Sequence, residues 1–151
     1  MTILAITLLL GLFATALKRV PQGHVYSLHR AGRQRRLLQP GLHWVVPGLD
    51  RIAHRIDLGG QMLRFDETPA SADTSAVRGT VYWQVLEPER ADDVIGEAEQ
   101  LIRSGTLDAL HTEPASARAN RRDLGGRVKQ RLNHSLRQRG VMVTRVDVEA
   151  A

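Results

Sequence analysis

The chain has 151 residues, enough for one domain of ordinary size, and a formal net charge of +5. It contains no cysteine, which excludes disulfide frameworks, thiolate zinc sites and cysteine nucleophiles. The charge is divided into three blocks along the chain. Residues 18–64 contain nine Lys/Arg and two Asp/Glu, a net charge of +7. Residues 65–113 contain three and eleven, a net of −8, and residues 114–151 contain nine and three, a net of +6. A basic block that follows an apolar segment suits an anionic lipid surface better than a nucleic acid.

The apolar N-terminus, Met1–Leu17, has no charged side chain and includes six leucines. As a helix it would span about 25 Å against a hydrocarbon core of about 30 Å, and Lys18 and Arg19 can snorkel to the interface. We therefore predict a transmembrane anchor over residues 1–19. A cleaved signal peptide is the alternative, because Ala14-Thr15-Ala16 resembles a cleavage site, but signal peptides place their basic residues before the apolar stretch. A buried helix is the third possibility, and the lack of a polar face argues against it.

The distribution of basic residues around this segment predicts its orientation. No Lys or Arg precedes it, whereas Lys18, Arg19 and further arginines follow it. The positive-inside rule then predicts a single-pass protein of the cell inner membrane, with its N-terminus outside and its folded domain, residues 20–149, in the cytoplasm.

Residues 20–86 form a β-rich part in which short runs of strand-forming residues alternate with turns that contain Gly and Pro. The clearest run alternates apolar and polar residues and predicts a half-buried strand. The predicted strands are His24–Leu28, Arg35–Leu38, His43–Val46, Arg51–Leu58, Gln61–Phe65 and Ala76–Leu86.

Residues 87–149 form a helical part with a closing strand. The pattern predicts helices over Arg90–Ser104 and Thr106–His111, then a longer one in which Leu124, Val128, Leu132 and Leu136 recur every four residues. Gly125-Gly126 marks either a helix start or kink, or close packing against the sheet, which we favour. Gly140 is a natural C-cap before a final strand, Val141–Val148. The order of strands, helices and a last strand indicates the α+β class.

The sequence contains no common catalytic motif: a phosphate loop, a zinc-binding H-E-x-x-H helix and a G-x-S-x-G elbow are all missing. None of the six histidines pairs with another at helical spacing, and His24 and His29 fall on opposite faces of a strand. We therefore predict no catalytic, cofactor-binding or metal-binding residues, and a protein that is not an enzyme.

One apolar run suggests a membrane contact. Leu42, Trp44, Val45 and Val46 lie between two Pro-Gly turns and Leu49 directly follows the second, inside the basic block and near the predicted anchor. An interior strand is one interpretation; the other is an interfacial loop with Trp44 at headgroup level. The predicted membrane-contact residues are these five together with Lys18 and Arg19.

A series of short motifs resembles the stomatin/prohibitin/flotillin (SPFH, or band 7) family, and it covers nearly everything after the predicted anchor. Each motif alone is weak evidence for the family, and their common order and spacing make the resemblance more specific. The series comprises Val20-Pro21-Gln22-Gly23, Gly32-Arg33, Leu38-Gln39-Pro40-Gly41-Leu42-His43, Pro47, Asp50, Ile56-Asp57-Leu58, Ser71-Ala72-Asp73, Val77, Val81-Tyr82-Trp83-Gln84-Val85, Glu87-Pro88, Ala91, Thr106-Leu107-Asp108, Arg121, Gly140-Val141, Val143 and Val146.

The resemblance implies an antiparallel-rich sheet with packed helices, and assembly into membrane-bound rings or cages that organise microdomains. Some bacterial members regulate a membrane-bound FtsH-type protease, so an ATP-dependent protease is an implied partner. The chain departs from the family at Ser71 and Ala72, in an apparent insertion over His111–Asn120, and in ending at Ala151 before the usual coiled coil. This predicts a short bacterial-type member that forms small oligomers.

The leading hypothesis is thus a non-catalytic scaffold whose partners are anionic headgroups, further copies of itself and, as the resemblance implies, a membrane-bound ATP-dependent protease. The acidic middle block of one copy would meet the basic final block of the next. The alternative is a membrane-tethered binder of nucleic acid or another anionic ligand. Against it, the basic residues from Arg118 to Arg139 spread around a helix without aromatic platforms, so no specific nucleic acid is predicted.

Overall fold

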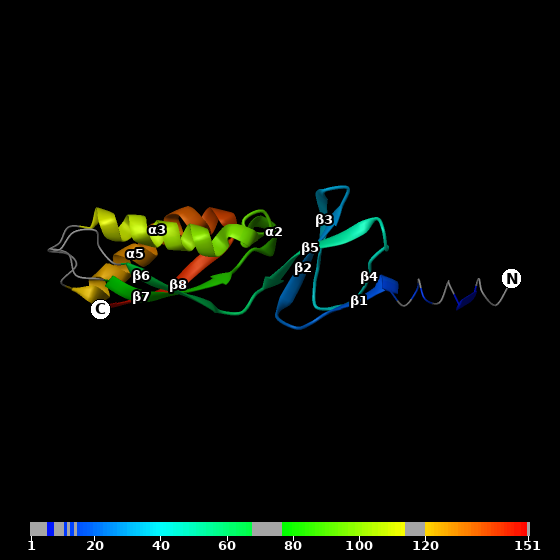
Figure 1. The fold of residues 1–151 in the computed structure, drawn as a ribbon, viewed down its shortest axis with the longest axis horizontal. Helices are drawn as coiled ribbons and strands as arrows, with labels where there is room; N and C mark the ends of the chain where they lie inside the picture. Colours follow the sequence, from blue (N-terminus) through cyan, green and yellow to red (C-terminus); the bar gives the residue numbers. More distant parts are fainter. Residues whose placement is uncertain are drawn as a thin grey trace. The chain divides into compact units, whose positions relative to one another are not determined.

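A computed structural model of the chain describes Ile6, Thr7, Gly11, Phe13 and residues 15–67, 77–113 and 120–150. The chain divides into two compact units, residues 1–58 and 59–151, which we describe separately (Figure 1). The predicted membrane helix, Met1–Leu17, lies largely outside the described residues. The helices that the structure does describe are all too short or too polar to cross a bilayer.

The first unit consists of two small antiparallel sheets. Strands β1 (Leu17–Val20) and β4 (Gly41–Trp44) form one of them. The other has the order β3-β2-β5, with β2 at His24–Arg30, β3 at Arg33–Leu38 and β5 at Asp50–Asp57. The pairing is antiparallel, and it does not follow the chain order, because β5 pairs with β2 and β4 pairs with β1.

The β2–β3 hairpin turns through Ala31 and Gly32, whose φ angles are +51° and +76°. Positive φ at both central residues suits the right-handed twist of the flanking strands. The hairpin helps to enclose a small hydrophobic core. This core consists of Val20, Leu28, Leu38 and Val45, with Tyr26 and Ile52 packed against it.

Strand β1 differs from the sequence expectation, which places Lys18 and Arg19 at the end of the apolar helix. Both residues lie in β1, opposite His43 and Leu42 of β4, and both are exposed. The same strand buries Val20 in the core. Pairing with β4 gives the backbone N–H and C=O groups of this segment their hydrogen-bond partners. Because β4 is distant in sequence, the periodicity of residues 17–20 alone does not predict this strand.

The second unit has an antiparallel sheet in the order β6-β7-β8, with β6 at Gln61–Glu67, β7 at Val77–Val85 and β8 at Val141–Ala150. Helices α3 (Ala98–Thr112) and α5 (Arg121–Leu136) cover one face (Figure 1). Short elements complete the unit: α2 (Pro88–Ala91), η1 (Ile95–Glu97) and η2 (Arg137–Arg139). The change from strands to helices that the sequence predicts near residue 86 therefore lies inside this unit.

The sequence predicts two helices, Arg90–Ser104 and Thr106–His111, and the predicted break between them is wrong. One helix, α3, runs through Gly105, and the irregular part lies earlier, between α2 and α3. A Cβ at Gly105 would lie 2.8 Å from Cδ2 of Leu132 on α5. This glycine thus permits close helix packing and does not end a helix.

The Gly125-Gly126 pair also lies within a continuous helix. A Cβ at Gly125 would meet the Val146 carbonyl oxygen at 2.5 Å, so this glycine lets α5 approach β8. The packing interpretation of the pair is confirmed for Gly125, whereas Gly126 has nothing within 4 Å of the Cβ position. Gly140, with φ +73°, ends η2 as the predicted C-cap.

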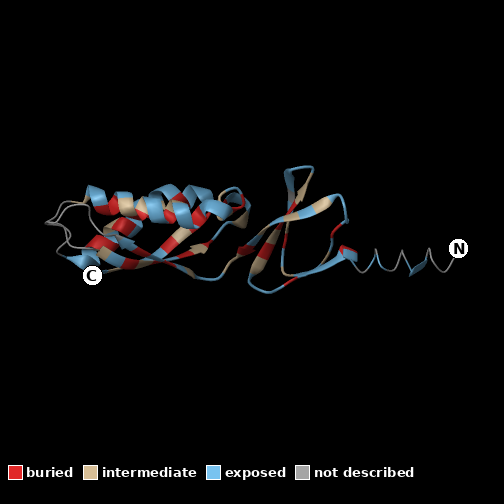
Figure 2. Ribbon diagram, viewed as in Figure 1, coloured by how far each residue is buried: buried red, intermediate tan, exposed pale blue. Residues whose placement is uncertain are grey.

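The buried residues of the second unit come from both its sheet and its helices (Figure 2). Trp83 is the largest of them, and its neighbours in β7 at Val81 and Val85 point the same way. From the helices come Ile102, Leu124, Val128, Leu132 and Leu136. The four-residue spacing in α5 thus forms a core face, as the sequence predicts.

Candidate functional site

The first unit exposes an apolar patch around β4 and the turn that follows it. Four of its side chains are exposed: Leu42 (66%), Trp44 (49%), Val46 (44%) and Leu49 (61%). Leu17 lies opposite Trp44 in the β1–β4 sheet and is also exposed. The Phe13 ring packs edge-on against Trp44, with 4.4 Å between ring centroids. We call these six residues the apolar patch.

Val45 is the exception among the predicted contact residues. Its side chain is buried in the core of the unit, and its N–H donates to the Ala16 carbonyl at 2.9 Å. Val45 directly follows β4, and its side chain is buried while those of Trp44 and Val46 are exposed. Val45 therefore does not belong to the apolar patch, and it holds the patch to the core.

The turn from β4 to β5 is held by Asp50, whose side chain is only 3% exposed. Its carboxylate accepts hydrogen bonds from Arg30 Nε at 2.7 Å and from the Val46 N–H at 3.0 Å. The bond to Asp50 raises the pKa of Arg30 above its ordinary value, so the guanidinium stays charged. Two further bonds to the Val46 carbonyl come from the N–H groups of Leu49 and Asp50. The apolar patch thus lies on a fixed turn.

Basic residues adjoin the apolar patch. Lys18 and Arg19 are exposed on β1, in register with His43 and Leu42. Arg36 donates to the Trp44 carbonyl at 3.0 Å. An apolar surface bordered by long cationic side chains is the arrangement found where proteins lie on anionic bilayers, because the stems pack and the charges meet headgroups.

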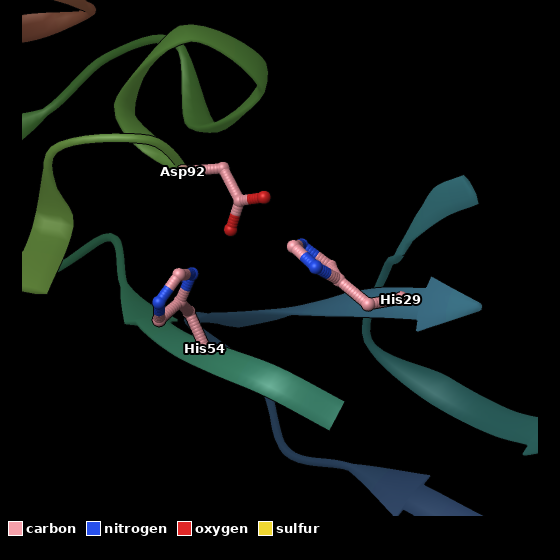
Figure 3. Close-up of side chains that lie close together, drawn as sticks. All are labelled: His29, His54 and Asp92. Atoms are coloured by element: carbon pink, nitrogen blue, oxygen red, sulfur yellow. The ribbon is translucent and has the colours of Figure 1, made fainter. Parts of the chain in front are cut away.

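The structure brings together a histidine pair that sequence spacing misses. His29 on β2 and His54 on β5 lie with ring centroids 6.0 Å apart and planes at 83° (Figure 3). Strand pairing sets His54 opposite Ser27, two residues before His29, with a register shift between. Asp92, drawn in the same close-up, belongs to the second unit, where it is buried after α2. The prediction that no histidine binds a metal stays a prediction.

The second unit has a strongly basic helix surface. Four leucine and valine positions of α5 face the core, so its charged residues are confined to the remaining side. Arg121, Arg122, Lys129 and Arg131 are all exposed there. The buried positions of α5 therefore leave these basic residues on the exposed part of the helix.

The comparison with known families decides the classification. The SPFH domain / Band 7 family matches residues 18–151, which run from within β1 to the end of the chain. The chain belongs to this family. The match confirms the resemblance and the α+β class, and neither it nor the described residues show a catalytic arrangement.

Individual relatives agree with this assignment. The chain is 28% identical over 102 residues to stomatin-like protein 2, mitochondrial, of Rattus norvegicus, a match covering 66% of this chain and 29% of that protein. The Homo sapiens protein of the same name is 28% identical over 97 residues, which are 62% of this chain and 27% of that one. An uncharacterized protein of Schizosaccharomyces pombe is 30% identical over 102 residues, covering 66% and 29%. The chain spans less than a third of the length of these relatives.

Proposed function

We propose that this SPFH protein is a membrane-anchored, non-catalytic scaffold whose copies assemble side by side. The observation that carries the proposal is the apolar patch. Six large apolar side chains are exposed on one small unit, and two of them, Phe13 and Leu17, belong to the apolar N-terminal stretch. Exposed single apolar residues are common, but a contiguous group bordered by cations marks an interaction surface. The partner that suits this surface is a bilayer with anionic headgroups.

In this proposal the apolar residues before β1 supply the anchor, which is shorter than the predicted residues 1–19 because Leu17, Lys18 and Arg19 pair with β4, and residues 20–149 supply the SPFH domain. The N-terminus is outside and the domain is in the cytoplasm of a cell with an inner membrane, because the basic block begins only after the apolar stretch. Protease added outside spheroplasts should leave the domain intact. Digestion of the domain from outside would reverse the orientation.

Anchored copies share one orientation and two dimensions, so weak lateral contacts suffice to hold them together. The opposite charges of residues 65–113 and 114–151 supply such contacts. Exposed ion pairs are worth under about 1 kcal/mol each and are screened by salt. Cross-linking of the full chain in membranes should therefore give a ladder at low salt that shortens at high salt. A monomer band under both conditions would reject the scaffold mechanism.

The finer roles within this proposal are organisation of membrane microdomains and regulation of a membrane-bound ATP-dependent protease. Both require a surface that further subunits can reach, and neither requires a catalytic residue in this chain. Cross-linking in native membranes followed by mass spectrometry would identify the partner. Recovery of a protease subunit supports the second role, and recovery of this chain with lipids alone supports the first.

The alternative, a binder of nucleic acid or another anionic ligand, is favoured by the exposed basic side of α5. That helix contains no Phe, Tyr or Trp on which bases could stack. Binding of a single-stranded oligonucleotide that survives about 0.2 M salt would support this alternative, since purely electrostatic binding falls steeply with salt.

A further inference from the structure

The helix layer of the second unit is divided into an acidic and a basic half. Residues 87–113, which include α2, η1 and α3, carry eight acids and two arginines, a net of −6. Residues 120–140, which include α5 and η2, carry seven basic residues and one acid, a net of +6. Equal and opposite charges thus lie on neighbouring segments of one layer.

The sheet sets these halves on opposite sides of the unit. Helix α3 contacts β6, at one edge of the sheet, and α5 contacts β8, at the other edge. The two helices lie next to each other over the same face (Figure 1). We call the side with α2, η1, α3 and β6 the acidic flank, and the side with α5 and β8 the basic flank.

Side chains on both flanks are available to a partner. Glu89, Asp93, Glu97 and Glu99 are exposed on the acidic flank, and within the described residues no ion pair engages them. The two halves are joined within the molecule by one described ion pair between α5 and the end of α3, Arg127 Nε to Glu113 Oε2 at 2.9 Å. Most of the charge of each flank therefore faces outward.

The basic flank contains a groove of about 370 Å³ between α5 and β8. Its cationic lining comes from Arg121, Arg122 and Lys129 of α5, and its opposite wall is the strand from Thr144 to Val148, where Arg145 is paired with Asp147 at 2.6 Å. Gly126 leaves the groove open, because nothing lies within 4 Å of its Cβ position. Arg122 and Lys129, four residues before and three after it, share its side of the helix.

The edge of β8 is already occupied where it passes α5. The Asn133 amide donates to the Val143 carbonyl at 2.9 Å and accepts from the Val143 N–H at 2.7 Å, as a neighbouring strand would. Docking by addition of a strand is therefore blocked at this position. A partner of the basic flank has to bind through side chains, and carboxylates fit its charge.

We propose that the basic flank of one copy binds the acidic flank of a second copy, with acidic side chains from Glu89 to Glu99 entering the groove beside Gly126. This contact is head-to-tail, so each copy offers one flank to each neighbour and the series closes into a ring or continues as an array. The inference rests on the proposed lateral assembly and assigns the surfaces that make it.

The chain offers a clean chemical test, because Lys18 and Lys129 are its only lysines. A carbodiimide joins a lysine amine to a carboxylate only when the two are in contact. Isotope-labelled and unlabelled full-length chains are mixed in phosphatidylcholine vesicles, treated with carbodiimide and analysed by mass spectrometry. We expect mixed-isotope links from Lys129 to acids within residues 87–99. Lys129→Arg should abolish these links and preserve the oligomers seen on native gels.

Charge reversal tests the direction of the contact. Arg121→Glu/Arg122→Glu lowers the net charge of residues 120–140 from +6 to +2, and Glu97→Arg/Glu99→Arg changes that of residues 87–113 from −6 to −2. Each variant alone should lose the Lys129 links by about tenfold or more, because attraction at several exposed pairs becomes repulsion. A mixture of the two variants should regain them, only between unlike chains. Arg51→Glu, an exposed reversal in the first unit, is the matched control and should change nothing.

Gly126 provides a test that leaves the charges unchanged. Gly126→Trp should fill the groove and reduce the Lys129 links as far as charge reversal does, whereas Gly126→Ala should keep them. Both variants should fold, since the position is exposed and open.

The outcomes separate this inference from the proposed function. Oligomers whose Lys129 links do not map to residues 87–99, or do not respond to reversal, overturn the inference and leave lateral assembly standing. Chains that stay monomeric overturn both. If Arg121→Glu/Arg122→Glu keeps the links and loses binding to phosphatidylserine vesicles, the basic flank contacts lipid headgroups and the inference fails.

Discussion

The two units of the chain present opposite kinds of surface. The first unit has two small sheets around a core of four buried residues, and it leaves large apolar side chains exposed on β4 and its turn. The second unit covers one sheet face with two helices and buries its apolar residues there (Figure 2). Its open sheet face carries polar groups, including the Arg78–Asp66 and Arg145–Asp147 ion pairs at 3.0 and 2.6 Å.

This contrast indicates different partners. The first unit has apolar area that its own core does not use, so a bilayer would remove that area from water. Among its described residues the second unit exposes fewer large apolar side chains, namely Met62, Tyr82 and Leu86, and it has charge of both signs on separate flanks. An apolar surface suits lipid, and two oppositely charged flanks suit copies of the same chain.

Among substitutions that distinguish the two units, we expect the largest loss of stability at Trp83 in the second unit. Replacement by Ala should lower the free energy of unfolding of the second unit by about 3–5 kcal/mol, because a large buried side chain leaves a cavity. Hydrogen exchange resolved by residue would follow both units in urea. Protection should fall in β6, β7 and β8 and persist in β2 and β5; equal loss in both units would show that they unfold together.

Leu28 is the corresponding position in the first unit. Leu28→Ala should lower the stability of that unit by about 3 kcal/mol, since the side chain is buried in its small core. Leu42→Ala is the matched control on the same unit and should cost under about 0.5 kcal/mol, because its side chain is exposed. Similar losses for the two variants would mean that the apolar patch belongs to the core.

Replacing each of the two neighbouring glycines of α5 by alanine should change the stability of the second unit in opposite directions. Gly125→Ala should destabilise the second unit by about 1–3 kcal/mol, because its Cβ would overlap the Val146 carbonyl. Gly126→Ala should stabilise the unit by up to about 1 kcal/mol through helix propensity. Chemical denaturation of both variants against the unchanged chain is the measurement, and equal effects would contradict the packing of α5 on β8.

Asn133→Ala is expected to give a smaller loss, about 1–2 kcal/mol, because the Val143 N–H and carbonyl each lose a partly buried partner. Exchange of the Val143 amide should accelerate more than that of other β8 amides. An unchanged rate would show that this edge is protected by other means.

Local patterns predict much of the fold. Strand alternation indicates β7, four-residue spacing indicates the core face of α5, and Gly140 marks the end of the helical segment, because each depends on neighbours in sequence. What the sequence cannot supply is long-range pairing. Strand β1 exists through β4, and the helix α3 continues through Gly105 because Leu132 packs there.

The candidate site divides in the same way. The apolar run from Leu42 to Leu49 is evident in the sequence, but the inward direction of Val45 depends on the core. Phe13 and Leu17 join the patch only through the ring contact and the β1–β4 register. The separation of acidic and basic flanks is likewise set by the order β6-β7-β8, which charge blocks along the chain do not reveal.

Depth-dependent quenching of Trp44 tests the central claim most directly. In the full chain with Trp83→Phe, Trp44 is the only tryptophan, and in the chain with Trp44→Phe, Trp83 is the matched control. On anionic vesicles, lipids that carry quenchers at headgroup and upper acyl level should strongly quench Trp44 and leave the buried Trp83 unaffected. Trp44 fluorescence that lipid quenchers do not reach, while a water-soluble quencher does, would contradict a bilayer-facing first unit.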